Sequence, residues 1–153
     1  MKTFWKENFM YLLCLIFLSL LFILWGRIVA KELRANAYTK QLTTLEARLL
    51  CLEHYGWEVD PGSETRKTVS IPDPLDSVYE EYNKLQTVSG FDVNRFRGRT
   101  AECYTYIALN FPYETEETVY VNLLICEGTL IAGDCMTTAL DGFMLPLDRR
   151  YLP

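Results

Sequence analysis

Hydrophobic residues form two different patterns along the chain. From Asn8 to Gly26 the sequence carries no charged side chain, whereas beyond residue 37 apolar and polar residues alternate at helical or strand spacing. As an α-helix rising ~1.5 Å per residue, the first run reaches about 28 Å, close to the thickness of a bilayer's hydrocarbon core. The pattern predicts a tail of residues 1–7, a transmembrane anchor of residues 8–26, a basic stalk of residues 27–37 and a soluble domain of residues 38–153.

A cleaved signal peptide is the alternative interpretation of the same run. Signal peptides have a shorter apolar region followed at once by a cleavage site of small residues. Here the nearest such pattern, Ala35-Asn36-Ala37, lies far downstream and behind several basic residues. The run therefore favours an uncleaved anchor.

The basic residues around the run bear on its orientation. Four of them follow it within residues 27–40, whereas Lys2 and Lys6 precede it. The positive-inside rule would place the following domain in the cytoplasm. Bacterial signal-anchors, however, commonly export the domain behind them. We expect a single-pass protein of the cell membrane with an extracytoplasmic domain, and the cytoplasmic orientation is the alternative.

Two later segments have the spacing of amphipathic helices. The first ends at Gly56, and its apolar stripe comprises Tyr38, Leu42, Leu45, Leu49 and Leu52. The second should begin with Asp73 as its cap and Pro74 in its first turn, and should end at Gly90. Its predicted inward face comprises Leu75, Val78, Tyr79, Tyr82, Leu85 and Gln86.

Three strands are predicted in the second half of the chain, from their β-branched and aromatic content. They are Arg99–Leu109, Thr118–Cys126 and Thr129–Met136, and weaker strand signals occur at residues 57–59 and 66–71 around a turn at residues 60–63. Two helices followed by a meander of strands indicate an α+β fold. We expect a two-layer sandwich of two helices on a small, mainly antiparallel sheet.

The dipeptide Glu127-Gly128 favours a tight hairpin between the last two of these strands. A register set by that turn alone puts Val121, Leu123 and Ile125 on one face together with Leu130 and Ala132. Cys126 and Cys135 would then share the other face. If the preceding hairpin is tight, Cys103 would lie diagonal to Cys126, and a disulfide between these two is the less favoured alternative. A disulfide between Cys126 and Cys135 is not expected, because they are not directly opposite.

The charge of the domain limits its partners. Residues 38–153 carry a net charge near −8, whereas the first 37 residues carry +3. Nucleic acids and anionic lipids need a positive surface. We therefore expect no nucleic-acid partner.

The cysteines and the single histidine raise three chemical possibilities. Cys51, Cys103, Cys126 and Cys135 lie in the domain, and an even number outside the cytoplasm permits two disulfides. Their spacing matches no compact disulfide framework, so buried reduced thiols are favoured. Cys51 and His54 are one helical turn apart, but paired ligands at the close spacing typical of zinc sites are missing. We expect no metal and no cofactor.

Catalytic patterns are weak. A thiol nucleophile would have His54 as its only available histidine base. Glu80 and Glu81 point to different sides of a helix, and a pairing of Asp134 with Asp141 depends on the fold. Phosphate loops, nucleophile elbows and dinucleotide fingerprints do not occur in the sequence. We name no catalytic residue.

Several short motifs recur together from residue 52 onward. They are Leu52 to Val59 (LEHYGWEV), Ile71-Pro72, Val78 to Gln86 (VYEEYNKLQ), Gly90-Phe91-Asp92, Tyr104-Thr105-Tyr106, Gly133-Asp134-Cys135 and Leu140 to Met144 (LDGFM). In this combination the chain resembles a bacterial family known as domain of unknown function 4830. The resemblance implies a small bacterial domain behind an N-terminal membrane segment, and it implies no activity. This chain departs from the family pattern after Met144. The pattern leads us to expect a small or polar ending there, whereas this chain continues with Leu145-Pro146-Leu147.

Six polar residues are candidates for a ligand site. Some lie on or just after the second predicted helix and others near the last strand: Tyr82, Asn83, Gln86, Asp92, Asp134 and Asp141. They would form a polar pocket where the helix meets the sheet. In the alternative interpretation, Asn83, Asp92 and Asp141 bond to backbone at turns and helix ends.

These observations favour a membrane-anchored, non-enzymatic interaction or ligand-binding module. Its expected partners are the membrane, through residues 8–26, and an envelope protein or peptide. One alternative is a small thiol-dependent or other hydrolase that uses Cys103, Cys126 or Cys135 with His54. The other is the same domain facing the cytoplasm as a regulatory module.

Overall fold

The computed structural model describes residues 11, 15–29 and 38–152. The chain divides into two compact units, Met1–Ala37 and Tyr38–Pro153. The expected tail, part of the 8–26 run and most of the 27–37 stalk lie outside the described residues.

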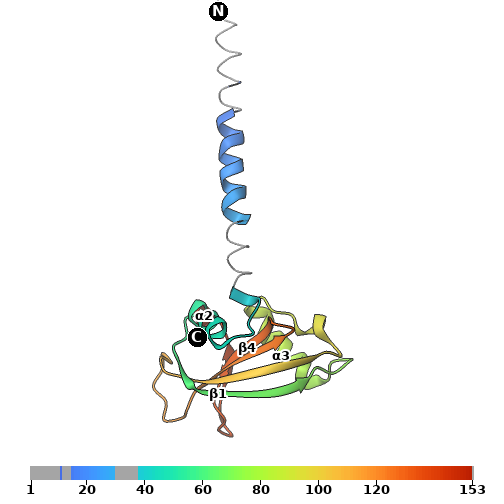
Figure 1. The fold of residues 1–153 in the computed structure, drawn as a ribbon, viewed down its shortest axis with the longest axis vertical. Coiled ribbons are helices and arrows are strands. Elements are labelled where there is room, and N and C mark those ends of the chain that lie inside the picture. The colour runs from blue at the N-terminus through green and yellow to red at the C-terminus, as the bar shows by residue number, and fades with distance from the viewer. Residues whose placement is uncertain (1–10, 12–14, 30–37, 153) are drawn as a thin grey trace, which may run out of the picture. The chain divides into compact units, whose positions relative to one another are not determined.

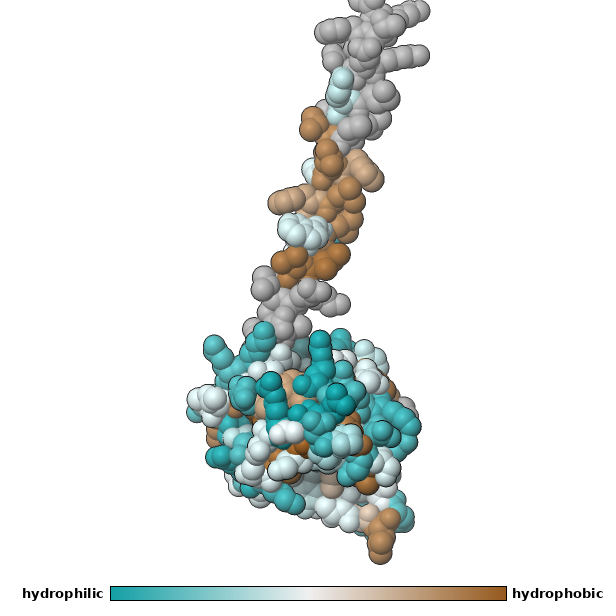
Figure 2. All heavy atoms as spheres, turned by 90° about the vertical axis from the view of Figure 1, so that its right-hand side faces the viewer, coloured by the Kyte–Doolittle hydropathy of each residue, from teal (hydrophilic) through white to brown (hydrophobic). Residues whose placement is uncertain are grey.

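In the first unit, residues 15–29 are helical. The large apolar side chains of this segment are exposed, from 46% for Leu21 to 71% for Phe22, and Figure 2 shows the segment as mostly brown with a few pale groups. Within the described residues, no helix is both long enough and apolar enough to cross a membrane.

The second unit is an α+β domain built on a five-stranded antiparallel sheet (Figure 1). The strands follow the order of the chain: β1 (Val59–Ser70), β2 (Thr100–Ala108), β3 (Tyr120–Cys126), β4 (Thr129–Met136) and β5 (Met144–Pro146). The helices of this unit are α2 (Leu45–His54) and α3 (Ser77–Val88), with short 3-10 turns η1 (Val93–Phe96) and η2 (Arg149–Tyr151).

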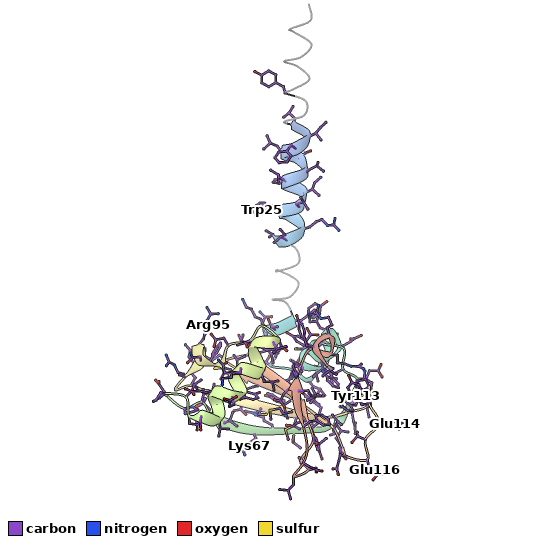
Figure 3. All side chains as sticks on the ribbon, turned by 180° about the vertical axis from the view of Figure 1, so that it is seen from behind. Trp25, Lys67, Arg95, Tyr113, Glu114 and Glu116 are labelled. Atoms are coloured by element: carbon purple, nitrogen blue, oxygen red, sulfur yellow. The ribbon has the colours of Figure 1, made fainter. Side chains whose placement is uncertain are left out.

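The two helices cover opposite faces of the sheet. Leu52 of α2 packs in one buried cluster with Leu123, whereas Tyr82 of α3 packs against a second cluster that contains Leu124. Neighbouring residues of a strand point to opposite faces, so both faces of β3 are apolar and both need cover. The expected two-layer sandwich is therefore wrong: α3 lies in front of the sheet in Figure 3 and behind it in Figure 1.

The caps of the two helices confirm one prediction and correct another. Thr44 caps α2 by accepting a hydrogen bond from the Ala47 amide at 3.2 Å, and the helix ends before Gly56, whose φ is +89°. Asp76, rather than Asp73, caps α3, because its carboxylate accepts from the Tyr79 amide at 2.9 Å.

The strand boundaries agree more closely with the prediction. β4 matches the expected Thr129–Met136, and the two weak strand signals join with the turn between them into the single edge strand β1. Glu127 and Gly128 both have positive φ, 50° and 75°, as a tight hairpin turn requires.

A β-bulge at Ile131 corrects the predicted faces of β4. Ile125 pairs with Leu130, but Leu124 pairs with Ala132, so one residue of β4 is extra. Beyond the bulge every side chain changes face. Ala132 therefore lies with Leu124 on the α3 face. Cys126 and Cys135 do not share a face, because they pack in different clusters.

A buried ion pair joins α2 to the sheet. The Arg48 guanidinium, only 5% exposed, donates from one nitrogen to both carboxylate oxygens of Glu64 in β1 at 2.9 Å. Its Nε donates to the Tyr106 hydroxyl of β2 at 2.9 Å, and Tyr106 donates to Glu64. The guanidinium also lies 4.0 Å from the ring centroid of Tyr104. Three elements are therefore fixed at one point.

We expect Arg48→Met to lower the free energy of unfolding by roughly 3 kcal/mol, because it leaves the Glu64 charge partly buried and unpaired. The matched control is Arg66→Met, which breaks the exposed Arg66–Glu102 pair and should change stability little. Urea unfolding of the full chain, followed by circular dichroism, measures both. Equal effects of the two variants would contradict a structural role for the buried pair.

Candidate functional site

A groove of about 470 Å³ lies between α3 and the sheet, and we call it the α3 groove. The groove exists because α3 is too short to cover the whole sheet. The helix packs mainly on β4 and β5, and it leaves part of β1, β2 and β3 uncovered. Its walls are mostly apolar: Val78, Tyr79 and Leu85 from α3, Val69 from β1, Leu124 from β3 and Met144 from β5.

A row of polar side chains crosses the sheet on the α3 face, and two of its members, Asn122 and Asp134, line the floor of the groove. Thr105, Asn122 and Asp134 stand directly opposite one another on β2, β3 and β4. The Thr105 hydroxyl donates to Asn122 Oδ1 at 2.6 Å, and Asn122 Nδ2 donates to Asp134 Oδ1 at 2.7 Å. From α3, the Tyr82 hydroxyl donates to Asp134 Oδ2 at 2.9 Å. The row therefore ends at the carboxylate of Asp134.

Burial controls the electrostatics of this floor. Asp134 is 3% exposed, and its burial raises the pKa of the carboxyl, while the bonds from Asn122 and Tyr82 act against the rise. Burial and the nearby Asp134 charge raise the pKa of Tyr82. Glu81 adds a second carboxylate at the groove wall, and none of the lining residues that the structure describes is Lys, Arg or His.

Of the six candidate residues, Tyr82 and Asp134 come together in the α3 groove. Gln86 lies close by without lining it. The Gln86 Oε1 atom accepts from the Gly133 amide at 2.9 Å, one residue before β4 begins to pair with β5. This completely buried side chain therefore provides a hydrogen-bond acceptor for the Gly133 N–H of β4.

The other three candidates lie outside the groove. Asn83 Oδ1 accepts from the Val93 amide at 2.7 Å and Asn83 Nδ2 donates to Asp92 at 3.3 Å, while Asp92 caps η1 through the Asn94 amide. These bonds fit the alternative in which both residues hold a helix end and a turn. Asp141 is exposed between β4 and β5.

Sequence reasoning missed Asn122 and Thr105. The available signal was Asn122 itself, a single amide in the otherwise apolar run Val121 to Cys126. An amide inside such a strand needs polar partners, and those partners become known only with the register of the sheet.

The four thiols of the domain are free. Cys103 and Cys126 belong to the α3 face, diagonal to each other as predicted, whereas His54 ends α2 on the opposite side. The rings of Tyr38 and Tyr55 lie 4.4 and 5.2 Å from the His54 ring.

Burial changes the pKa of three thiols, those of Cys51, Cys103 and Cys135. It raises the pKa of Cys51 and of Cys135 to about 12 and also raises that of Cys103. In the described part of the chain, no three or more His, Cys, Asp or Glu side chains gather closely enough to hold a metal ion.

Comparisons of the chain with family models, with curated proteins and with solved structures gave no match.

The raised pKa of Asp134 predicts how stability changes with pH. As pH rises, the unfolded state loses this proton first, near pH 4, so the native state binds more protons and stability falls until the native group has ionised. Asp134→Asn removes this loss. We expect the unfolding free energy of the wild type, minus that of the variant, to decrease as pH rises from 3 to 7 in urea titrations.

Asp148→Asn is the matched control with the opposite sign. Burial acts to raise the pKa of Asp148, but hydrogen bonds from Arg150 outweigh it and lower that pKa. Stability from Asp148 is therefore present above its unfolded pKa and lost in acid. If both variants show the same trend with pH, the assignment of the raised pKa to Asp134 is wrong.

Proposed function

We propose that residues 38–153 form a non-enzymatic binding module that holds a small ligand with an apolar body in the α3 groove. The observation that carries this proposal is the groove itself, with apolar walls over a buried and interconnected polar floor. Ligand sites commonly measure about 300–1,000 Å³ and combine mainly apolar walls with a few placed polar groups. The α3 groove has this size and composition.

The chemistry of the groove also supports binding over catalysis. Its cysteine, Cys103, has a raised pKa and therefore holds its proton at neutral pH, which makes it a poor nucleophile. Its buried acid, Asp134, is held by two hydrogen bonds from the protein. Fixed side chains of this kind hold a ligand in one orientation.

We propose that the module is a single-pass membrane protein with its domain outside the cytoplasm. The uncharged run of residues 8–26 supports an anchor. The exposed apolar side chains of the helical segment at residues 15–29 add support, because so large an apolar surface needs cover from water. The resemblance to domain of unknown function 4830 is part of this proposal and fits a bacterial envelope protein.

Occupation of the groove should protect Cys103 from a reagent that converts its thiol to a mixed disulfide, since Cys103 lines the groove. We expect n-octanol to slow the reaction of Cys103 with methyl methanethiosulfonate in the full chain in lipid nanodiscs, as measured by peptide mass spectrometry. The other three thiols of the domain are buried. Cys51 and Cys135 serve as internal references. Cys126 is left out of the references because it lies diagonal to Cys103, where the ligand could reach it.

Two tryptophan variants on α3 separate groove binding from a general lipid effect. The Val78 side chain is 72% exposed and lines the groove, so Val78→Trp should fill it and abolish protection by octanol. Val88→Trp changes an exposed residue of the same helix away from the groove and should leave protection intact. Equal protection in both variants would refute the groove as the site.

The orientation has its own test. External protease should remove a C-terminal tag from intact bacterial cells that carry the full chain, if the domain lies outside. A tag that survives in intact cells and is cut only after lysis would instead support the cytoplasmic orientation and the positive-inside count.

A further inference from the structure

We infer that the ligand of the α3 groove carries a protonated amine, which binds the carboxylate of Asp134 while its apolar part lies between α3 and the sheet. This inference rests on the proposed function and adds the chemical class of the ligand.

The direction of the hydrogen bonds on the floor is the first argument. The Thr105 hydroxyl proton goes to Asn122, an Asn122 amide proton goes to Asp134, and the Tyr82 hydroxyl proton also goes to Asp134. These hydrogen bonds therefore run toward one acceptor, the carboxylate of Asp134. The Tyr82 hydroxyl, which is the donor that α3 presents to Asp134, is therefore already used.

The remaining capacity of Asp134 is the second argument. An ionised carboxylate has about four acceptor positions, and the structure shows one donor on each oxygen. Asp134 lines the groove although it is 3% exposed, so the groove is its route to a ligand. A buried carboxylate gains most from a partner that brings both a donor and a positive charge.

The surroundings of the floor favour a cation further. Glu81 adds a second carboxylate at the groove wall, where it forms an exposed ion pair with Lys84. The rings of Tyr79 and Tyr82 meet edge to face 6.4 Å apart, and aromatic faces attract ammonium groups. On β1, the basic residue Lys67 pairs with Cys103 of the groove, and its side chain is exposed (Figure 3).

Other ligand classes fit this chemistry less well. A carboxylate or phosphate would meet the buried carboxylate of Asp134 with the same sign of charge. A divalent metal ion needs six or more oxygen ligands, whereas the groove walls are mainly apolar. An ammonium group on an apolar body satisfies both parts of the site.

Three probes of equal chain length test the inference: n-octylamine, n-octanol and n-octanoate. Each is titrated at pH 7 against the full chain in nanodiscs, and the concentration that halves the labelling of Cys103 is measured. Val78→Trp provides the blank for probe dissolved in the lipid. We expect octylamine to protect at a concentration roughly 30-fold or more below octanol, and octanoate to protect least.

Variants then assign the preference to one carboxylate. Asp134→Asn should weaken protection by octylamine roughly 30-fold and change that by octanol little. Glu81→Gln, at the wall, should reduce the preference for octylamine by only a few fold. The comparison of the three probes on the wild type needs no variant, so it stands if Asp134→Asn fails to fold.

The outcomes separate the inference from the proposed function. Octanol and octylamine protecting at equal concentrations would overturn the inference and leave the groove as a ligand site. An unchanged preference for octylamine in folded Asp134→Asn would overturn the role of Asp134. No protection by any probe would overturn the proposed function together with the inference.

Discussion

The β-bulge at Ile131 is the constraint on which the candidate site depends. With the simple register of the Glu127-Gly128 turn, Asp134 would stand opposite Val121 and face the core under α2. The extra residue moves Asp134 opposite Asn122, on the face that α3 covers. The polar row, the bond from Tyr82 and the polar floor of the groove all follow from this one change of face.

The two faces of the sheet are stabilised in different ways. Under α2, the ion pair between Arg48 and Glu64, completed by Tyr106, holds the helix to two strands, and a large apolar cluster surrounds it. On the other face, α3 packs mainly on β4 and β5, and a groove remains between the helix and the rest of the sheet. A firmly held face gives the open face a fixed floor, which is what a binding site needs if its polar groups are to keep their positions.

Local patterns predicted the elements of this domain better than their arrangement. The limits of β4 and the tight turn at Glu127-Gly128 follow from strand propensity and turn chemistry, and both are confirmed. The faces of β4 beyond Ile131 were wrong, because a bulge leaves no clear mark in an apolar run. The sequence alone was enough to name Tyr82 and Asp134 as candidate site residues. Asn122 could be recognised as a hydrogen-bond partner of Asp134 only once the register of the sheet was known.

The burial of Asp134 explains why the groove would discriminate between ligands as well as bind them. Without a ligand, the carboxylate is stabilised by Asn122 and Tyr82 against the cost of leaving water, and burial still raises its pKa. A neutral apolar ligand would cover Asp134 further without pairing it, which works against binding. A cationic ligand of the same shape offsets that cost, because its charge and its proton both meet the carboxylate. Such amphiphiles also concentrate at membrane surfaces, so the proposed anchor would raise the local concentration of the ligands that the groove prefers.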